Sequence, residues 1–138
     1  MSQAAQIELI ERRRRQRFTA EQEGRPQFRV LVDGECLPVL DLSLECFSMP
    51  AATPPATHRG IQFVLQHAER SGEVCGTARI VNYQGAPAGG QAGCAFESID
   101  GDGLARLEQW LAAHVLAAAS VPIRAHEAAG IVRGPSLV

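Results

Sequence analysis

Short segments in which apolar and polar residues alternate constrain the fold of this chain more than any other feature. In the first of them, QFRVLVDG, the residues Phe28, Val30 and Val32 fall on one side of an extended backbone. A period of two puts every second side chain on the same face of a strand, so one face can be buried. The Asp33-Gly34 pair that follows is typical of a two-residue hairpin turn. This segment therefore predicts a strand, a tight turn and an antiparallel return strand.

Similar alternating segments continue to about residue 99. We expect strands over residues 35–42 and in the segments LECFSM, RGIQFVLQH, GEVCGTARIVNYQ and AGCAFESI. The proline-rich PAATPPATH and the glycine-rich GAPAGGQ between them are loop and turn signals. Short strands with turn signals at this spacing are typical of a small all-β barrel or sandwich.

One helical pattern follows the strands. Apolar residues recur every three or four positions at Leu104, Leu107, Leu111, Val115 and Ala118. This stripe predicts an amphipathic helix over residues 102–119, which would lie across one mouth or face of the barrel and end before Pro122. Trp110 and His114 flank the stripe, and we interpret both as packing residues.

The chain divides into three parts. Residues 1–18 have few apolar positions and four adjacent arginines that repel one another, so we expect a flexible N-terminal arm. Residues 19–119 hold the expected barrel and its closing helix. Residues 120–138 have little core-forming pattern, and we expect a C-terminal tail that is either disordered or docked on another surface.

The segment ERRRRQRF, residues 11–18, is the densest cluster of positive charge in the chain. All 13 basic residues are Arg, yet the formal net charge is −2. Because the positive charge is local, an anionic partner should be local too. The low aromatic content of 5% and the slightly acidic balance argue against a barrel that binds RNA or DNA polymers.

Neither the cysteines nor the histidines form a pattern that is typical of metal binding or catalysis. The cysteines, which we expect to be mostly buried strand residues in a reducing compartment, are Cys36, Cys46, Cys75 and Cys94. The histidines are scattered and no nucleophile–base pair is recognisable, so we expect neither enzymatic activity nor a metal or cofactor. The N-terminus lacks an apolar signal region, and the stretch WLAAHVLAAASV is too short to span a bilayer. Together these features predict a cytoplasmic protein without membrane insertion.

Two short motifs stand in a characteristic order. Arg13-x-x-x-Arg17 lies in the Arg-rich segment, and Asp41-x-Ser43 follows at the end of an expected strand. In this order, and followed by further strands and a helix, they resemble the PilZ domain family over about residues 11–115. In that family an R-x-x-x-R motif in a flexible N-terminal segment and a D/N-x-S-x-x-G motif on the barrel together bind cyclic di-GMP. The resemblance implies a six-stranded antiparallel β-barrel closed by a C-terminal α-helix.

The resemblance also implies a set of residues that bind the ligand. Carried onto this chain, the two motifs and the flanking arginines are Arg12, Arg13, Arg14, Arg17, Asp41, Ser43 and Cys46. Cys46 stands where the family has glycine. If the family has glycine there because the backbone adopts a positive φ angle, Cys46 introduces backbone strain. If it has glycine there because a purine approaches the backbone closely, the Cys46 side chain crowds the ligand. A third alternative is that the Cys46 side chain packs into the core.

The chemistry of these side chains suits a cyclic dinucleotide of guanine. A guanidinium donates two parallel hydrogen bonds to phosphate oxygens or to guanine O6 and N7, and its plane stacks on a purine face. The carboxylate of Asp41 can accept from guanine N1–H and N2–H₂, and the Ser43 hydroxyl can donate to a phosphate or a base. The arm would therefore supply charge and stacking, and the barrel would supply recognition of guanine.

We therefore expect a cyclic di-GMP receptor that relays the level of this second messenger to an unidentified downstream protein, as a monomer or weak dimer. The alternative is a PilZ-like adaptor that binds no nucleotide and acts only through protein contacts. Replacement of the family's glycine by Cys46 favours the adaptor, and the intact arginine and Asp41-x-Ser43 motifs favour the receptor. A third reading is a barrel that binds RNA or DNA through the arginine arm.

Overall fold

The computed structural model describes residues 18–22, 24–55, 59–87, 89–118 and 123–134. Its strands are β1 (Phe18–Thr19), β2 (Glu21–Gln22), β3 (Arg25–Pro26), β4 (Phe28–Val32), β5 (Glu35–Pro38), β6 (Asp41–Leu42), β7 (Cys46–Ala51), β8 (Gly60–His67), β9 (Glu73–Gln84) and β10 (Gly90–Ile99). Two described helices come next, α2 (Gly103–Ala118) and α3 (Ala125–Arg133).

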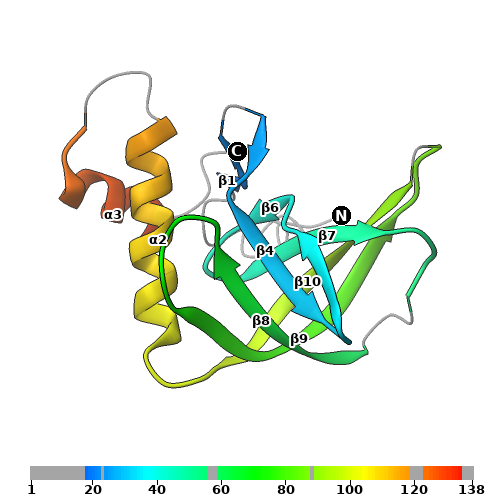
Figure 1. Ribbon diagram of the computed structural model, residues 1–138. Helices are drawn as coiled ribbons and strands as arrows, with labels where there is room; N and C mark the ends of the chain where they lie inside the picture. Colours follow the sequence, from blue (N-terminus) through cyan, green and yellow to red (C-terminus); the bar gives the residue numbers. More distant parts are fainter. Residues whose placement is uncertain (1–17, 23, 56–58, 88, 119–122, 135–138) are drawn as a thin grey trace, which may run out of the picture.

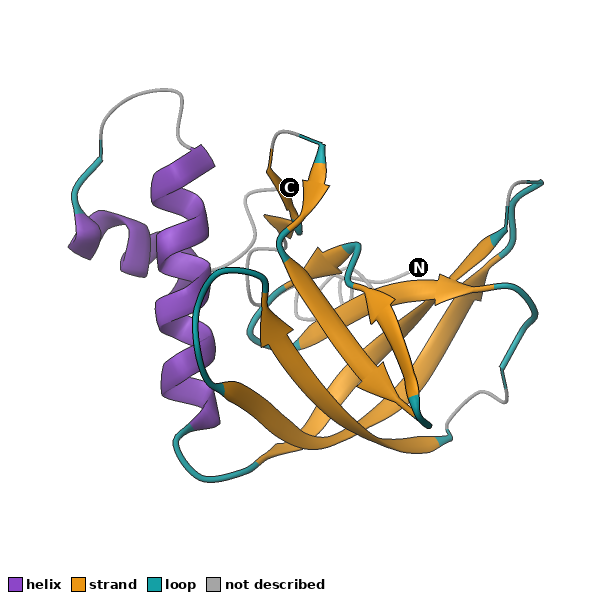
Figure 2. Ribbon diagram, viewed as in Figure 1, coloured by secondary structure: helices purple, strands orange, loops and turns teal. Residues whose placement is uncertain are grey.

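Eight of the described strands form one sheet in the order β1-β6-β7-β10-β9-β8-β4-β5, and β2 pairs only with β3. The pairings between these strands are antiparallel. The sheet curls into a half-barrel, and α2 stands along one side of it (Figures 1 and 2). The expected all-β fold with a C-terminal helix is confirmed, whereas the expected number of six strands is wrong.

The segment over residues 35–42, expected as one strand, explains part of the difference. Its first half is β5, which pairs with β4 at one edge of the sheet, and its end is β6, which pairs with β7 and β1 at the other. Between them, the Val39 N–H donates to the Phe28 carbonyl at 3.0 Å and the Leu40 N–H donates to the Ser48 carbonyl at 2.9 Å. The chain thus passes from one edge to the other, and these two bonds hold the edges of the curled sheet together.

The alternating apolar side chains of β4 and β8 are buried, namely Phe28, Val30, Val32, Ile61, Phe63 and Leu65. The rings of Phe47, Phe63 and Phe96 lie with centroids 5.2 to 5.7 Å apart in this core. Asp33 and Gly34 have φ angles of 51° and 82°, the left-handed conformation that a tight hairpin turn requires. The predicted hairpin between β4 and β5 is therefore confirmed.

Helix α2 packs on the sheet with a stripe rotated slightly from the predicted one. Its buried residues are Gly103, Leu107, Trp110, Leu111 and His114. Leu104, expected in the stripe, is 46% exposed. The helix meets the sheet at Gly103 instead, where a β carbon would collide with Ile99 and come close to Val74 of β9. The predicted packing roles of Trp110 and His114 are confirmed.

A cluster of rings joins α2 to the sheet. The Phe28 ring lies 4.9 Å from His67 and 5.7 Å from His114, and Trp110 lies 5.7 Å from His67. The Nδ1 atom of His67 accepts two backbone N–H bonds, and burial lowers the pKa of this imidazole, so the ring is neutral at pH 7. The Nε2–H of His114 donates to the Thr19 carbonyl at 2.8 Å, which ties the helix to β1.

The C-terminal tail is docked in its described part. Helix α3 buries Ala128 and Val132, and Arg133 forms an ion pair with Glu108 of α2 at 2.9 Å. Figure 1 shows α2 between the sheet and α3. Of the two alternatives for the tail, docking therefore holds for residues 123–134.

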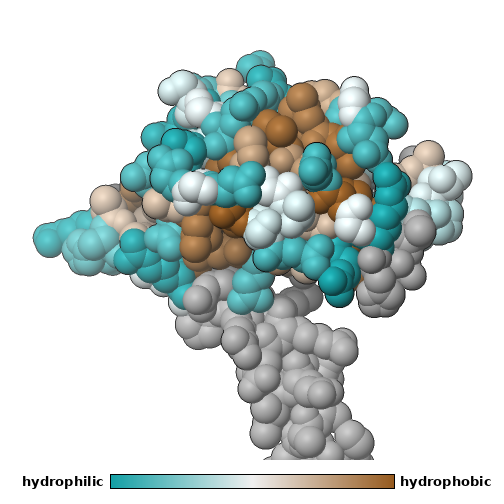
Figure 3. Space-filling view, turned by 90° about the horizontal axis from the view of Figure 1, so that it is seen from below, coloured by the Kyte–Doolittle hydropathy of each residue, from teal (hydrophilic) through white to brown (hydrophobic). Residues whose placement is uncertain are grey.

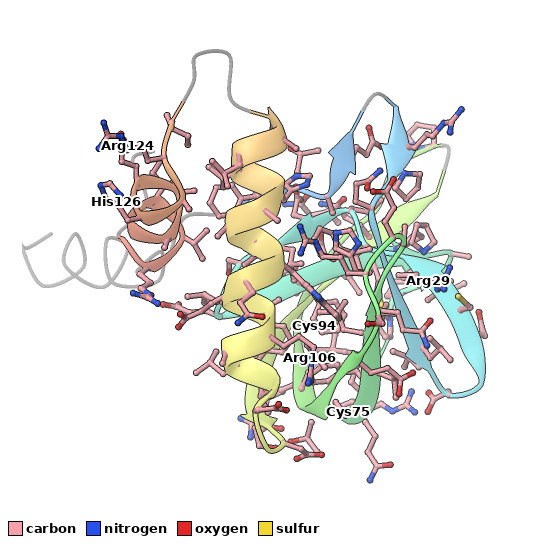
Figure 4. The ribbon with its side chains drawn as sticks, turned by 60° about the vertical axis from the view of Figure 1, so that its left-hand side comes forward. Arg29, Cys75, Cys94, Arg106, Arg124 and His126 are labelled. Atoms are coloured by element: carbon pink, nitrogen blue, oxygen red, sulfur yellow. The ribbon has the colours of Figure 1, made fainter. Side chains whose placement is uncertain are left out.

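The cysteines differ in their surroundings. Cys36 is exposed, Cys46 and Cys75 are half-buried, and Cys94 is buried within the sheet (Figure 4). The expectation of mostly buried cysteines therefore holds only for Cys94, and Cys36, which lies on the edge strand β5, departs from it most. Burial raises the pKa of the Cys94 thiol to about 11, so this thiol is protonated at neutral pH.

Candidate functional site

Ser43 organises the turn that joins β6 to β7. Its hydroxyl oxygen accepts from the backbone N–H groups of Glu45 and Cys46, each at 3.1 Å, and its own N–H donates to the Cys46 carbonyl at 2.9 Å. The residue is only 2% exposed. A short polar side chain that bonds the backbone two and three residues later is a typical turn former. Because the residue is almost fully buried and does not line the groove described below, the structure does not present the Ser43 hydroxyl to a ligand there, contrary to what the sequence led us to expect.

We expect Ser43→Ala to lower the free energy of unfolding by about 1–3 kcal/mol, because the two amides would lose a buried acceptor. Urea unfolding followed by circular dichroism measures this effect. Ser98→Ala is a matched control, because the Ser98 hydroxyl is exposed and bonds only to Thr77 among the described residues. The control should change stability by no more than about 0.5 kcal/mol. Equal stability of the two variants would contradict the turn-forming role of Ser43.

Asp41 is half-buried at the start of β6 and is bonded to the neighbouring strand. The Ser48 hydroxyl donates to Asp41 Oδ2 at 3.2 Å, and the Asp41 N–H donates to the Ser48 oxygen at 3.1 Å. This arrangement orients the carboxylate at the rim of a groove. A fixed carboxylate of this kind can accept hydrogen bonds from a donor pair on a ligand.

The groove beside Asp41 has a volume of about 1040 Å³. One flank is formed by the β6–β7 turn and β7, including Glu45, Cys46 and Ser48. The other flank and the floor come from β9 and β10, including Val81, Asn82, Gln91 and Gly93. The volume is at the upper end of what a compact organic ligand occupies in a protein.

Cys46 lines this groove as the first residue of β7. Among the described non-glycine residues, only Asp33 has a positive φ angle, so the backbone at Cys46 does not need a glycine. The alternative of backbone strain at Cys46 is therefore wrong. Its sulfur lies 3.4 Å from the Ser43 hydroxyl and the side chain is half-buried, so it occupies space at the wall of the groove.

Strand β1, which begins directly after Arg17 in the sequence, pairs with the strand that contains Asp41. Phe18 and Thr19 pair with Leu42 and Asp41 of β6. The expected ligand-binding arginines, Arg12, Arg13, Arg14 and Arg17, lie outside the described residues. Phe18, the last residue of the Arg-rich segment, is the one that the structure describes, and it lies on the strand next to Asp41.

Sequence reasoning missed six polar or exposed residues that line the groove, namely Glu45, Ser48, Val81, Asn82, Gln84 and Gln91. Their strands were predicted, but nothing in the sequence shows that these strands lie beside the Asp41 turn. The polar residues within the otherwise apolar segments around positions 48 and 82 are the only signal that could have pointed to them.

Other kinds of site find little support in the part of the chain that the structure describes. No three His, Cys, Asp or Glu side chains there converge on a point that could hold a metal ion. Neither of the two described helices is long and apolar enough to cross a membrane.

No protein-family model and no curated protein matches this chain at a significant level. Among solved structures, it is similar to the Inhibitor of motility (MotI/DgrA) of Bacillus subtilis, with a TM-score of 0.65 and 13% sequence identity. The match covers 80% of this chain and 54% of that one, so this chain spans about half the length of its structural neighbour. At this identity the likeness shows the fold alone. The chain therefore has a PilZ-like all-β fold, a curled antiparallel sheet with a C-terminal helix.

Proposed function

We propose that this protein is a cyclic di-GMP receptor whose Arg-rich N-terminal segment and groove together bind the nucleotide. The observation that supports this most is the pairing of β1 with β6, which brings the end of the Arg-rich segment to the strand of Asp41. Without that pairing, the two motifs would have no structural relation. With it, Phe18, the residue after Arg17 in the chain, lies on the strand beside Asp41, which lines the groove.

The chemistry and the energetics are compatible with a useful affinity. Each charge-assisted hydrogen bond between an arginine and a phosphate or guanine contributes roughly 1.5–3 kcal/mol. A few such bonds, less the cost of ordering the segment and the ligand, give a binding free energy of about −8 kcal/mol, or a Kd of about 1 μM. Binding would order the arginines, because an anion between them offsets their mutual repulsion.

Isothermal titration calorimetry with cyclic di-GMP, GTP and single-stranded RNA tests this proposal. We expect cyclic di-GMP to bind at micromolar or lower concentration and the other two to bind much more weakly. Tighter binding of RNA would favour a nucleic-acid protein, and absence of any nucleotide binding would reject the receptor.

We expect Asp41→Ala to reduce the preference for guanine more than the general affinity for anions. The carboxylate accepts from guanine N1–H and N2–H₂, which adenine does not present together, while its negative charge repels phosphate. The measurement is the ratio of cyclic di-GMP to cyclic di-AMP affinity. Asp102→Ala, at the exposed start of α2 and outside the groove, is the charge-matched control. An unchanged ratio in Asp41→Ala would mean that another group reads guanine.

The proposed output is a contact with a downstream protein, without catalysis or a cofactor, by a cytoplasmic monomer or weak dimer. The likeness to an inhibitor of motility suggests motility as one such output. Contact surfaces are available: Leu104 and Leu116 of α2 and Ile131 of α3 are exposed. Figure 3 also shows apolar surface between hydrophilic areas on the face that it displays. Exposed apolar surface of this kind also favours the second candidate, an adaptor that binds proteins but no nucleotide.

A further inference from the structure

A β-bulge directs two neighbouring side chains of β9 into the groove. Gly93 of β10 pairs with Asn82, but the next residue, Cys94, pairs with Ile80, so Val81 has no partner in β10. In a regular strand, adjacent side chains point to opposite faces. Here Val81 and Asn82 both line the groove, and Val81 is 42% exposed. Bulges commonly re-aim side chains beside functional sites.

The amide of Asn82 lies across Gly93 on the adjacent strand. A β carbon built on Gly93 would collide with the Asn82 Oδ1 atom and would lie 3.0 Å from its Cγ and 3.1 Å from its Nδ2. The absence of a side chain at Gly93 therefore leaves the space that the amide occupies. Asn82 is exposed and lines the groove, so its amide donor and acceptor face the space that a ligand would occupy.

The register of the sheet relates this amide to Asp41. Asp41 pairs with Ser48, Ser48 pairs with Gly93, and Gly93 pairs with Asn82, which makes one row across β6, β7, β10 and β9. Cross-strand partners share a face of the sheet. Three strand spacings separate the ends of the row, or about 14 Å along the sheet. One planar base cannot span that length, but a ligand with two bases can meet both ends.

We propose that Val81 and Asn82 form a second base-binding subsite, on the flank of the groove opposite Asp41. Val81 offers an apolar surface to the face of a purine, and the Asn82 amide bonds its edge. A carboxamide offers one acceptor and adjacent donors, which match N1–H and O6 of guanine. The proposal rests on the proposed function, because the ligand is taken to be cyclic di-GMP. The base in this subsite belongs either to the cyclic di-GMP molecule that contacts Asp41 or to a second cyclic di-GMP molecule stacked on it. A binding stoichiometry of one ligand per chain indicates the first case, and two ligands per chain the second.

Calorimetric titration of the full chain with cyclic di-GMP tests the subsite through three variants and one control. Asn82→Ala removes the amide, Gly93→Ala displaces it without altering it, and the double variant contains both changes. Gly60→Ala of β8 is the control, because its β carbon would approach only Glu97 Oε1, at 3.9 Å. The clash at Gly93 involves a flexible side chain and no backbone, so Gly93→Ala should fold, which its melting temperature verifies.

We expect Asn82→Ala and Gly93→Ala each to weaken binding by roughly threefold to tenfold, the effect of one or two hydrogen bonds. The double variant should bind within about twofold of Asn82→Ala, because Gly93 acts through the amide. Wild-type affinity in both single variants, with weakened binding in Asp41→Ala, would overturn the subsite and leave the proposed function standing. Equal weakening by Gly60→Ala would also overturn it. No binding by the unsubstituted chain would reject the proposed function and the subsite together.

Discussion

Gly76→Ala is expected to lower the free energy of unfolding by about 3 kcal/mol or more, with a fall in melting temperature of roughly 10 °C. Gly76 lies in β9 between two strands, paired with Phe63 of β8 and with Ile99 of β10. The register of β10 shifts between Phe96 and Ser98, and a β carbon on Gly76 would collide with the Ser98 carbonyl. Because the clash is with the backbone of a strand that pairs with β9 at this point, no side chain can move to relieve it.

Thermal and urea unfolding of Gly76→Ala measure this effect, and Gly60→Ala is again the control. Both changes add one methyl group to a strand glycine without a positive φ angle, but only Gly76 has backbone in the way. Stability of Gly76→Ala equal to that of Gly60→Ala would mean that β9 and β10 do not approach each other as described.

Arg13→Ala and Arg17→Ala are each expected to weaken cyclic di-GMP binding at least tenfold while leaving the melting temperature unchanged. Each variant loses charge-assisted hydrogen bonds to phosphate or guanine, and a factor of ten corresponds to about 1.4 kcal/mol. The fold should be unaffected, because the core of the described residues consists of apolar side chains from Ala20 onward. Calorimetry on each variant and on the double variant gives the affinities.

Arg124→Ala is the matched control for lost positive charge. Arg124 is exposed at the start of α3 and projects on the side of that helix away from α2, as Figure 4 shows. Its removal should change affinity by less than about twofold, because Arg124 does not line the groove and salt screens exposed charges. Wild-type binding by the double Arg13/Arg17 variant would reject the role of the Arg-rich segment.

Asp41 lines the groove, and the Ser48 hydroxyl donates to its carboxylate; that this carboxylate binds a ligand stays a prediction. Ser43 belongs to the same motif but serves the turn, because its hydroxyl lies within reach of two amides of the following residues. A motif records which residues occur together, and only the geometry shows which of them face the groove. The roles of the arginines stay predictions.

The sequence by itself determined the elements whose cause is local. Alternation over Phe28 to Val32, the Asp33-Gly34 turn and the helical spacing around Leu107 depend on neighbours within a few residues, and each appears where it was expected. Only the tertiary structure decided which strands adjoin. The division of residues 35–42 between two edges and the row from Asp41 to Asn82 depend on pairings between residues far apart in the chain. Such pairings are set by the burial of both partners and by bulges that shift the register, and no local periodicity encodes them.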